Sequence, residues 1–178
     1  VLTIDDGYGY IDTVTYTGAL DNALYLMGGF GNDELTGQND VHTGFIGLWG
    51  NDTLDGGQMD VNVDTNSVGY NLNTEGVYGQ ITWDGITLGG DVDKGAAGED
   101  TLINITDLAG SQHSDNLSVY STDQSHSATR VFTLSGLGGD DTIEGTSGLG
   151  GYTLASYEDD PGSVTVDLQN SWAEDGWG

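Results

Sequence analysis

A glycine-rich turn that ends in an aspartate, followed by one large aliphatic residue, recurs along this chain and constrains its fold more than any other sequence feature. The best copy, residues 28–37, has the sequence GGFGNDELTG. It fits the nonapeptide G-G-x-G-x-D-x-U-x at every fixed position, where U is a large aliphatic residue. Residues 47–56 and 136–145 depart from the pattern only in having leucine at the second glycine.

Three further copies are more degenerate. Residues 95–102 have alanine at the second position, residues 110–117 have His113 at the fourth, and residues 9–14 keep only the ending. Each copy predicts a turn and then a short strand with its middle side chain inward, as in the polar–apolar–polar residues 34–36. Helices of ordinary length are not expected with glycine spread so evenly, because an interior glycine costs about 1 kcal/mol.

The charge balance excludes several classes of function. The chain has 29 acidic and 2 basic residues, a formal net charge of -27. It therefore lacks the basic face that a nucleic-acid binder needs, and an anionic membrane would repel it. It has no cysteine, which excludes disulfides, and its 31 glycines bury almost no side-chain surface. High charge with low hydrophobicity is typical of disordered chains, so either this chain is disordered or something outside the sequence neutralises the acid.

On these motifs the chain resembles the hemolysin-type, repeats-in-toxin (RTX) family of calcium-binding nonapeptides. Residues 157–168 and 67–72 resemble the spacers between motif blocks in large secreted members. The resemblance implies an all-β fold, a right-handed parallel β-roll or β-helix solenoid with irregular spacer strands. It also implies calcium ions between turns of adjacent coils, held by the aspartates and by loop carbonyls. The adjacent perfect repeats usual in the family are missing, so the number of ions stays open.

The spacing of the motif aspartates agrees with coils of this kind. Asp12, Asp33 and Asp52 are 21 and 19 residues apart, close to the 18 or so residues of two nonapeptides, which predicts that they lie on the same side of successive coils. The later intervals, Asp100 to Asp115 and Asp115 to Asp141, are 15 and 26 residues and predict coils of varying length.

The domain organisation is predicted to be a single calcium-binding segment, residues 1–178, of a longer protein, because the chain begins without methionine and contains no linker-like stretch. Its motif blocks lie at about 9–57 and 95–145, and its spacers at about 58–94 and 150–178. Strands are expected within the irregular parts, at residues 118–120, 131–134 and 164–166.

Calcium takes six to eight hard oxygen ligands, so one aspartate must be supplemented by main-chain carbonyls presented by sharp turns. Glycine allows the positive φ angles that such turns need. The predicted calcium ligands are Gly28, Gly29, Gly31, Asp33, Gly50, Asp52, Gly98, Asp100, Asp115, Gly139 and Asp141. Ordinary β-turns, which also favour Asn, Asp and Gly, are the alternative. We expect Asp33, in the best motif, to matter more for calcium than Asp115.

No catalytic constellation is evident, so the segment is predicted not to be an enzyme. Its histidines, His42, His113 and His126, form no H-x-x-x-H pair, and no G-x-S-x-G is present. Residues 60–64 imitate the start of an EF-hand loop, but Thr65 stands where glycine is needed, and an alternating strand is the better interpretation. The four tryptophans could stack on sugars; packing in the interior is the preferred interpretation. They are Trp49, Trp83, Trp172 and Trp177.

These features predict a calcium-stabilised structural segment of a secreted or cell-surface bacterial protein of the adhesin, surface-layer or filament and matrix type, which folds on meeting calcium outside the cell. Two alternatives remain: the calcium-binding part of a secreted enzyme (a protease, lipase or polysaccharide-modifying enzyme), or a carbohydrate-binding module. The expected partners are calcium, further copies end to end, or cell-surface glycans.

Overall fold

The structure, a computed structural model, describes residues 2–3, 13–15, 24–58, 65–123, 130–145, 151–170 and 172–177. Within these ranges the chain forms strands, turns and one 3₁₀ turn, η1 (Gly95–Ala97), and no α-helix. The all-β class predicted from the sequence is confirmed. No helix of the described part has the length and apolar character that a membrane crossing requires.

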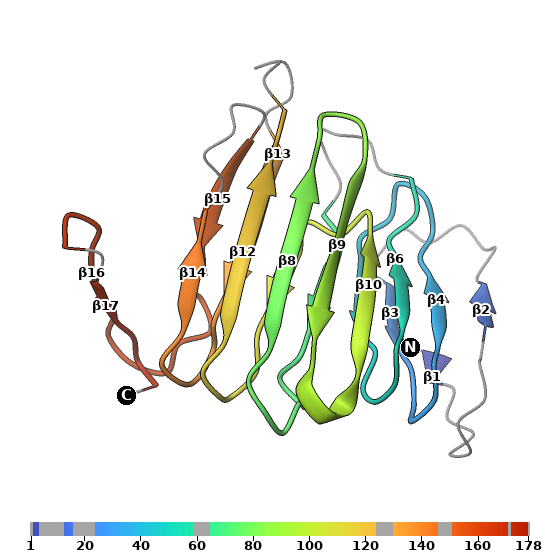
Figure 1. Cartoon of the computed structure of the whole chain (residues 1–178), viewed down its shortest axis with the longest axis horizontal. Coiled ribbons are helices and arrows are strands. Elements are labelled where there is room, and N and C mark those ends of the chain that lie inside the picture. Colours follow the sequence, from blue (N-terminus) through green and yellow to red (C-terminus); the bar gives the residue numbers. More distant parts are fainter. Residues whose placement is uncertain are drawn as a thin grey trace.

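Two large sheets lie face to face along the long axis of the molecule (Figure 1). The seven-stranded sheet contains, in spatial order, β1 (Leu2–Thr3), β3 (Leu24–Met27), β5 (Thr43–Ile46), β7 (Ser67–Gly69), β11 (Asp107–Ala109), β13 (Arg130–Ser135) and β15 (Gly151–Ala155). The eight-stranded sheet contains β14 (Thr142–Glu144), β12 (Asn116–Ser121), β8 (Tyr78–Trp83), β9 (Leu88–Asp93), β10 (Glu99–Ile103), β6 (Thr53–Asp55), β4 (Glu34–Thr36) and β2 (Thr13–Thr15).

The chain alternates between the two sheets, so that one circuit adds one strand to each. Strands β1 to β7 and again β11 to β15 follow this rule, and every pairing in the seven-stranded sheet is parallel. The pairing of Glu34 with Thr53 places residues 19 positions apart side by side, as the motif spacing predicted.

One detour interrupts this alternation. After β7, strands β8, β9 and β10 follow one another within the eight-stranded sheet, and β9 runs antiparallel to both of its neighbours. Strand β10 pairs with β6, whereas β8, which comes earlier in the chain, pairs with the later β12. The detour therefore inserts two extra strands into the eight-stranded sheet between the motif aspartates Asp52 and Asp100.

The core is a single apolar layer between the sheets, because the inward residue of nearly every strand is large and aliphatic or aromatic. The motif aliphatic residues contribute one side of this layer: Leu35, Leu54, Leu102 and Leu117 are all at most 1% exposed, and Ile143 packs against the edge. The opposite sheet contributes Leu26, Phe45, Val68, Leu108, Phe132 and Leu134.

The strands expected in the irregular parts lie within β12, β13 and β16 (Thr165–Asp167). Strand β16 pairs with β17 (Trp172–Glu174) in a separate antiparallel hairpin beyond the last strands of the large sheets (Figure 1). Residues 9–12 of the degenerate first motif, which include Asp12, the EF-hand-like residues 60–64 and His126 all lie outside the described residues.

Candidate functional site

The motif aspartates lie at the start of strands in the eight-stranded sheet and form two rows. The register of β4, β6 and β10 places Asp33 beside Asp52 and Asp52 beside Asp100; we call these three residues the first row. The register of β12 and β14 places Asp115 beside Asp141, the second row. Strands β9 and β8 separate the rows, so Asp100 and Asp115 are not neighbours although they are close in sequence.

Within each row, a carboxylate holds the neighbouring circuit by a main-chain hydrogen bond. The Asp33 amide donates to Asp52 Oδ1 at 3.0 Å, and the Asp52 amide donates to Asp100 Oδ1 at 3.1 Å. In the second row the Asp115 amide donates to Asp141 Oδ1 at 2.9 Å. The aspartates therefore join successive circuits before any metal is considered.

Two of the carboxylates, Asp33 and Asp115, also close their own turns, and the position of the carboxylate explains the first glycine of most motifs. The amides of Gly29 and Ser111 donate to Asp33 Oδ2 and Asp115 Oδ2, each at 2.6 Å. A Cβ on the first glycine of the motif would collide with the same carboxylate oxygen. This applies to Gly28, Gly47, Gly110 and Gly136.

In the best motif, positive φ angles do not occur where the sequence predicted them. Gly28, Gly29 and Gly31 are not among the positive-φ residues, so the prediction that these glycines supply left-handed turns is wrong for the best motif. Their role is spatial: Gly28 makes room for Asp33, and the Gly31 carbonyl packs against Gly50 of the next circuit.

The prediction of positive φ holds at the fourth position of three other motifs. Gly50, Gly98 and Gly139 have φ angles of 116°, 114° and 114°. The two leucines that replace the second glycine also lie in the left-handed region, Leu48 at 69° and Leu137 at 70°, a conformation that is unfavourable for a residue with a Cβ.

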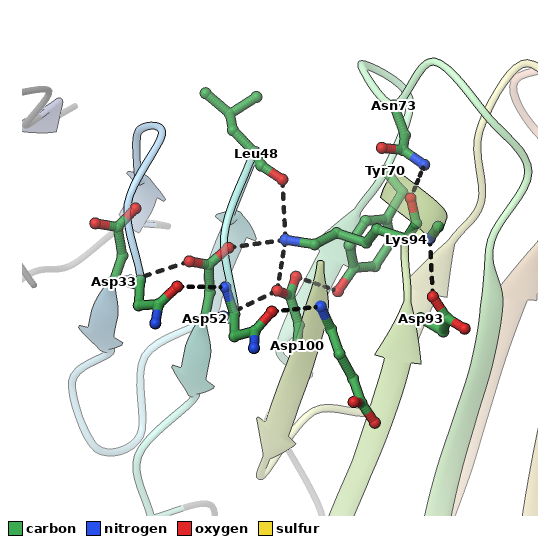
Figure 2. A network of polar contacts seen from close by, with 12 residues as sticks. Asp33, Leu48, Asp52, Tyr70, Asn73, Asp93, Lys94 and Asp100 are labelled. Carbon is green, nitrogen blue, oxygen red and sulfur yellow. Dashed lines mark hydrogen bonds and ion pairs between the residues drawn. The ribbon is translucent and has the colours of Figure 1, made fainter. Parts of the chain in front are cut away.

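A lysine that the sequence analysis did not identify lies between two aspartates of the first row. Lys94 Nζ contacts Asp100 Oδ1 at 2.5 Å and Asp52 Oδ2 at 2.9 Å, and donates to the Leu48 carbonyl at 2.9 Å (Figure 2). The side chains of the lysine and both aspartates are 0% exposed. The Tyr70 hydroxyl donates to Asp100 Oδ2 at 2.9 Å and completes the network.

One ammonium group does not neutralise the two carboxylates around it. Burial and the Asp100 charge raise the pKa of Asp52 to about 6, although the Asp33 amide and Lys94 oppose this shift. The same surroundings raise the pKa of the Tyr70 phenol, chiefly by burial and by the Asp100 charge, so its hydroxyl stays protonated and donates. The first row therefore retains excess negative charge with Lys94 in place.

The second row has neither of the chain's two basic residues, because Arg130 lies over the Trp83 ring at 4.8 Å. Burial raises the pKa of Asp115, against hydrogen bonds donated by Val77 and Ser111. Burial, with Asp115 and Asp175 as further causes, raises the pKa of Asp141 to about 6. This row therefore binds protons more readily than ordinary aspartates do.

The atoms of both rows that could act as metal ligands are carboxylate and carbonyl oxygens, which suit a hard cation such as calcium. The position where a Cβ of Gly28 would stand is approached by the Asp33 carboxylate and by the Gly47 carbonyl of the next circuit. In the second row, the Cβ position of Gly110 is approached in the same way by the Asp115 carboxylate and by the Gly136 carbonyl. No group of three or more acidic or histidine side chains that could hold a metal occurs in the described ranges, so carbonyls have to supply part of any such site.

Of the predicted ligands, the structure brings the aspartates and the turn glycines together along two rows, but not as one continuous series. Lys94 and Tyr70 were missed. A signal for Lys94 was present, since the chain has one lysine and it directly precedes a motif glycine. Tyr70 gave no signal, because it lies 30 residues from its partner Asp100.

The aromatic residues divide into two groups. Trp83 is buried, as the interior-packing interpretation expected, whereas Trp49, Trp172 and Trp177 are 40–51% exposed. Phe30 and Trp49, both at the third motif position, lie 6.5 Å apart between ring centroids on the surface.

Comparisons with known proteins identify no relative. No family model matches the sequence, and neither a curated protein nor a solved structure matches the chain at a significant level.

Proposed function

We propose that this chain is a calcium-stabilised structural segment of the RTX type, built as a right-handed parallel β-roll or β-helix and belonging to a secreted or cell-surface bacterial protein. The observation that carries the proposal is the stacking of the motif aspartates, four of them buried, in two rows at the starts of neighbouring strands of the eight-stranded sheet. The alternation of parallel strands between two sheets supports the solenoid architecture.

Calcium would be held by the aspartates of adjacent circuits together with carbonyls of the motif turns. Asp33 and Asp52 would serve in the first row, and Asp115 and Asp141 in the second. A bound ion would neutralise carboxylates whose burial is otherwise unfavourable, and this gain in stability would couple folding to calcium outside the cell. The role proposed is scaffolding in an adhesin, surface layer or matrix filament, without catalysis by this segment.

Circular dichroism during a calcium titration of the purified chain tests the proposal. We expect β-structure and the melting temperature to rise with calcium and to fall again with excess EDTA. Titration with magnesium at the same ionic strength is the control, because magnesium demands a tighter octahedral geometry. Identical spectra and melting curves in calcium and EDTA would overturn the proposal.

A second candidate is carbohydrate binding, which the exposed Phe30–Trp49 pair favours. Neighbouring exposed aromatic rings offer apolar faces on which sugar rings could stack. A glycan array in calcium, with Trp49→Ala as the matched variant, tests it; binding that this variant loses would support the module, and an empty array would reject it.

A further inference from the structure

We infer that Lys94 acts as a built-in cation that takes the place of one calcium ion in the first row, so that calcium is required beside Asp33 and in the second row but not between Asp52 and Asp100. This inference rests on the proposed function. It means that Lys94 makes one part of the chain independent of calcium, while the other motif turns depend on the ion.

The surroundings of the ammonium group are those expected of a metal position. Lys94 Nζ lies within 2.9 Å of carboxylate oxygens from two successive circuits and of a loop carbonyl, Leu48 O (Figure 2). These are the two kinds of donor that calcium uses. The group is wholly buried, so it is a fixed part of the row and not a mobile surface charge.

The main chain around Lys94 holds it in this place. The Lys94 amide donates to the Gly98 carbonyl at 2.8 Å, and the Lys94 carbonyl accepts from Ala97 at 3.3 Å and from Asn73 Nδ2 at 3.4 Å. The 3₁₀ turn that follows replaces the ordinary start of a motif, and Gly95 is held by Asp93. The departure of residues 95–97 from the repeat therefore serves to present the lysine.

The corresponding positions elsewhere have no ammonium group. Ser111, Asp115 and Asp141 occupy in the second row the places of Leu48, Asp52 and Asp100. There the Ser111 carbonyl accepts from the Gly138 amide at 3.4 Å. At the Asp33–Asp52 pair the corresponding Gly29 carbonyl accepts from the Trp49 amide at 3.1 Å. These two places have the carboxylates without the lysine.

A charge count agrees with this division. The first row has three carboxylates and the chain's one lysine, whereas the second row has two carboxylates and no lysine or arginine. A divalent ion would reduce the negative charge of each row. Replacing Lys94 by a neutral side chain removes the positive charge between Asp52 and Asp100 and opens a further place for an ion there.

Lys94→Met is the test variant, and Arg130→Met is its matched control because it removes the other buried cation, which lies over Trp83. In EDTA we expect Lys94→Met to lower the melting temperature by roughly 10 °C, since it leaves buried carboxylates unpaired. In equilibrium dialysis with calcium it should bind one ion more than the unchanged chain, and calcium should restore most of the lost stability. Arg130→Met should lose stability without gaining an ion.

Equal calcium stoichiometry in Lys94→Met and the unchanged chain would overturn the inference while leaving the proposed function intact. Absence of calcium binding by the unchanged chain would instead overturn the proposed function. If Lys94→Met does not fold, amine labelling of the unchanged chain decides, because the chain has one lysine. In EDTA, under conditions where circular dichroism still shows β-structure, Lys94 should remain unlabelled as in calcium; labelling of the still-folded chain once calcium is removed would show that the lysine does not replace the ion.

Discussion

The two aspartate rows use the same motif, but only the first contains a buried ammonium group. In the first row, Lys94 lies between Asp52 and Asp100 at hydrogen-bonding distance from both. In the second row, Asp115 and Asp141 are joined by a main-chain hydrogen bond and have no lysine or arginine beside them. The comparison shows that hydrogen bonds suffice to stack the carboxylates, whereas their charge is neutralised differently in the two rows.

The largest expected effect is that of removing a carboxylate from the lysine-containing row. In calcium-free buffer, Asp52→Ala should lower the free energy of unfolding by about 3–5 kcal/mol, because it breaks a buried ion pair and leaves the Asp33 amide without its acceptor. Asp141→Ala should cost only about 1 kcal/mol, since that side chain is half-buried and has no ammonium partner. Urea unfolding curves measure both values. Equal losses would mean that Lys94 does not distinguish the rows.

The next effect tests what the rows share. Gly28→Ala and Gly110→Ala should each cost about 1–3 kcal/mol, because the new Cβ meets the carboxylate of Asp33 or of Asp115. Gly69→Ala is the control, since its Cβ would have only one neighbour, at 3.9 Å, and should change stability by less than about 0.5 kcal/mol. Thermal melts of the three variants measure these losses. If Gly110→Ala did not lower the melting temperature, the first glycine would not be packed against its carboxylate in the same way in the two rows.

A smaller effect concerns pH in the second row. The pKa of Asp141 is raised from 3.8 to about 6 in the folded chain, so the folded state binds more protons than the unfolded state between these values. Its contribution to stability is complete below about pH 4 and is lost as the pH rises through about 6. After discounting for partial exposure, we expect a loss of roughly 1 kcal/mol over this range in calcium-free buffer.

Asp141→Asn checks this pH dependence, because it removes the titrating group and keeps an oxygen acceptor for the Asp115 amide. Stability measured from pH 4 to pH 6.5 should then fall less steeply than in the unchanged chain. An unaltered slope would assign the pH dependence to other groups, among them Asp52, whose pKa is also about 6.

The smallest expected effect distinguishes backbone strain from packing. Leu137 has a φ angle of 70°, so Leu137→Gly should be stabilising by about 0.5–1 kcal/mol, while Leu137→Ala, which keeps the Cβ, should not be. Leu48→Gly should give a similar gain, because Leu48 has nearly the same φ angle, 69°, and each leucine is half-buried and lines a pocket. Thermal melts at fixed pH measure the differences, and a destabilised Leu137→Gly would contradict the strain argument.

The sequence allowed the all-β class, the inward aliphatic residues and the stacking of Asp33 on Asp52 to be predicted, because all three follow from the local period of the motif. The detour through β8 and β9 was not predictable from that period, since it depends on pairings between strands distant in the chain. The positive φ angles were assigned to the wrong glycines in the best motif because steric room and backbone handedness both favour glycine. Lys94 was missed because a charge was expected to come from outside the chain.

The detour has a consequence for how the sheet is assembled. Strand β8 precedes β10 in the chain but lies farther along the sheet, so the part that continues with β12 is built on β8, and β9 and β10 connect it to β6. The sheet therefore cannot grow by adding one circuit at a time through residues 78–103. We expect this meander to dock as a unit, and its docking to be a slow step of folding, because it closes the long loop between β6 and β10. The chain is then two short stacks joined at this central meander.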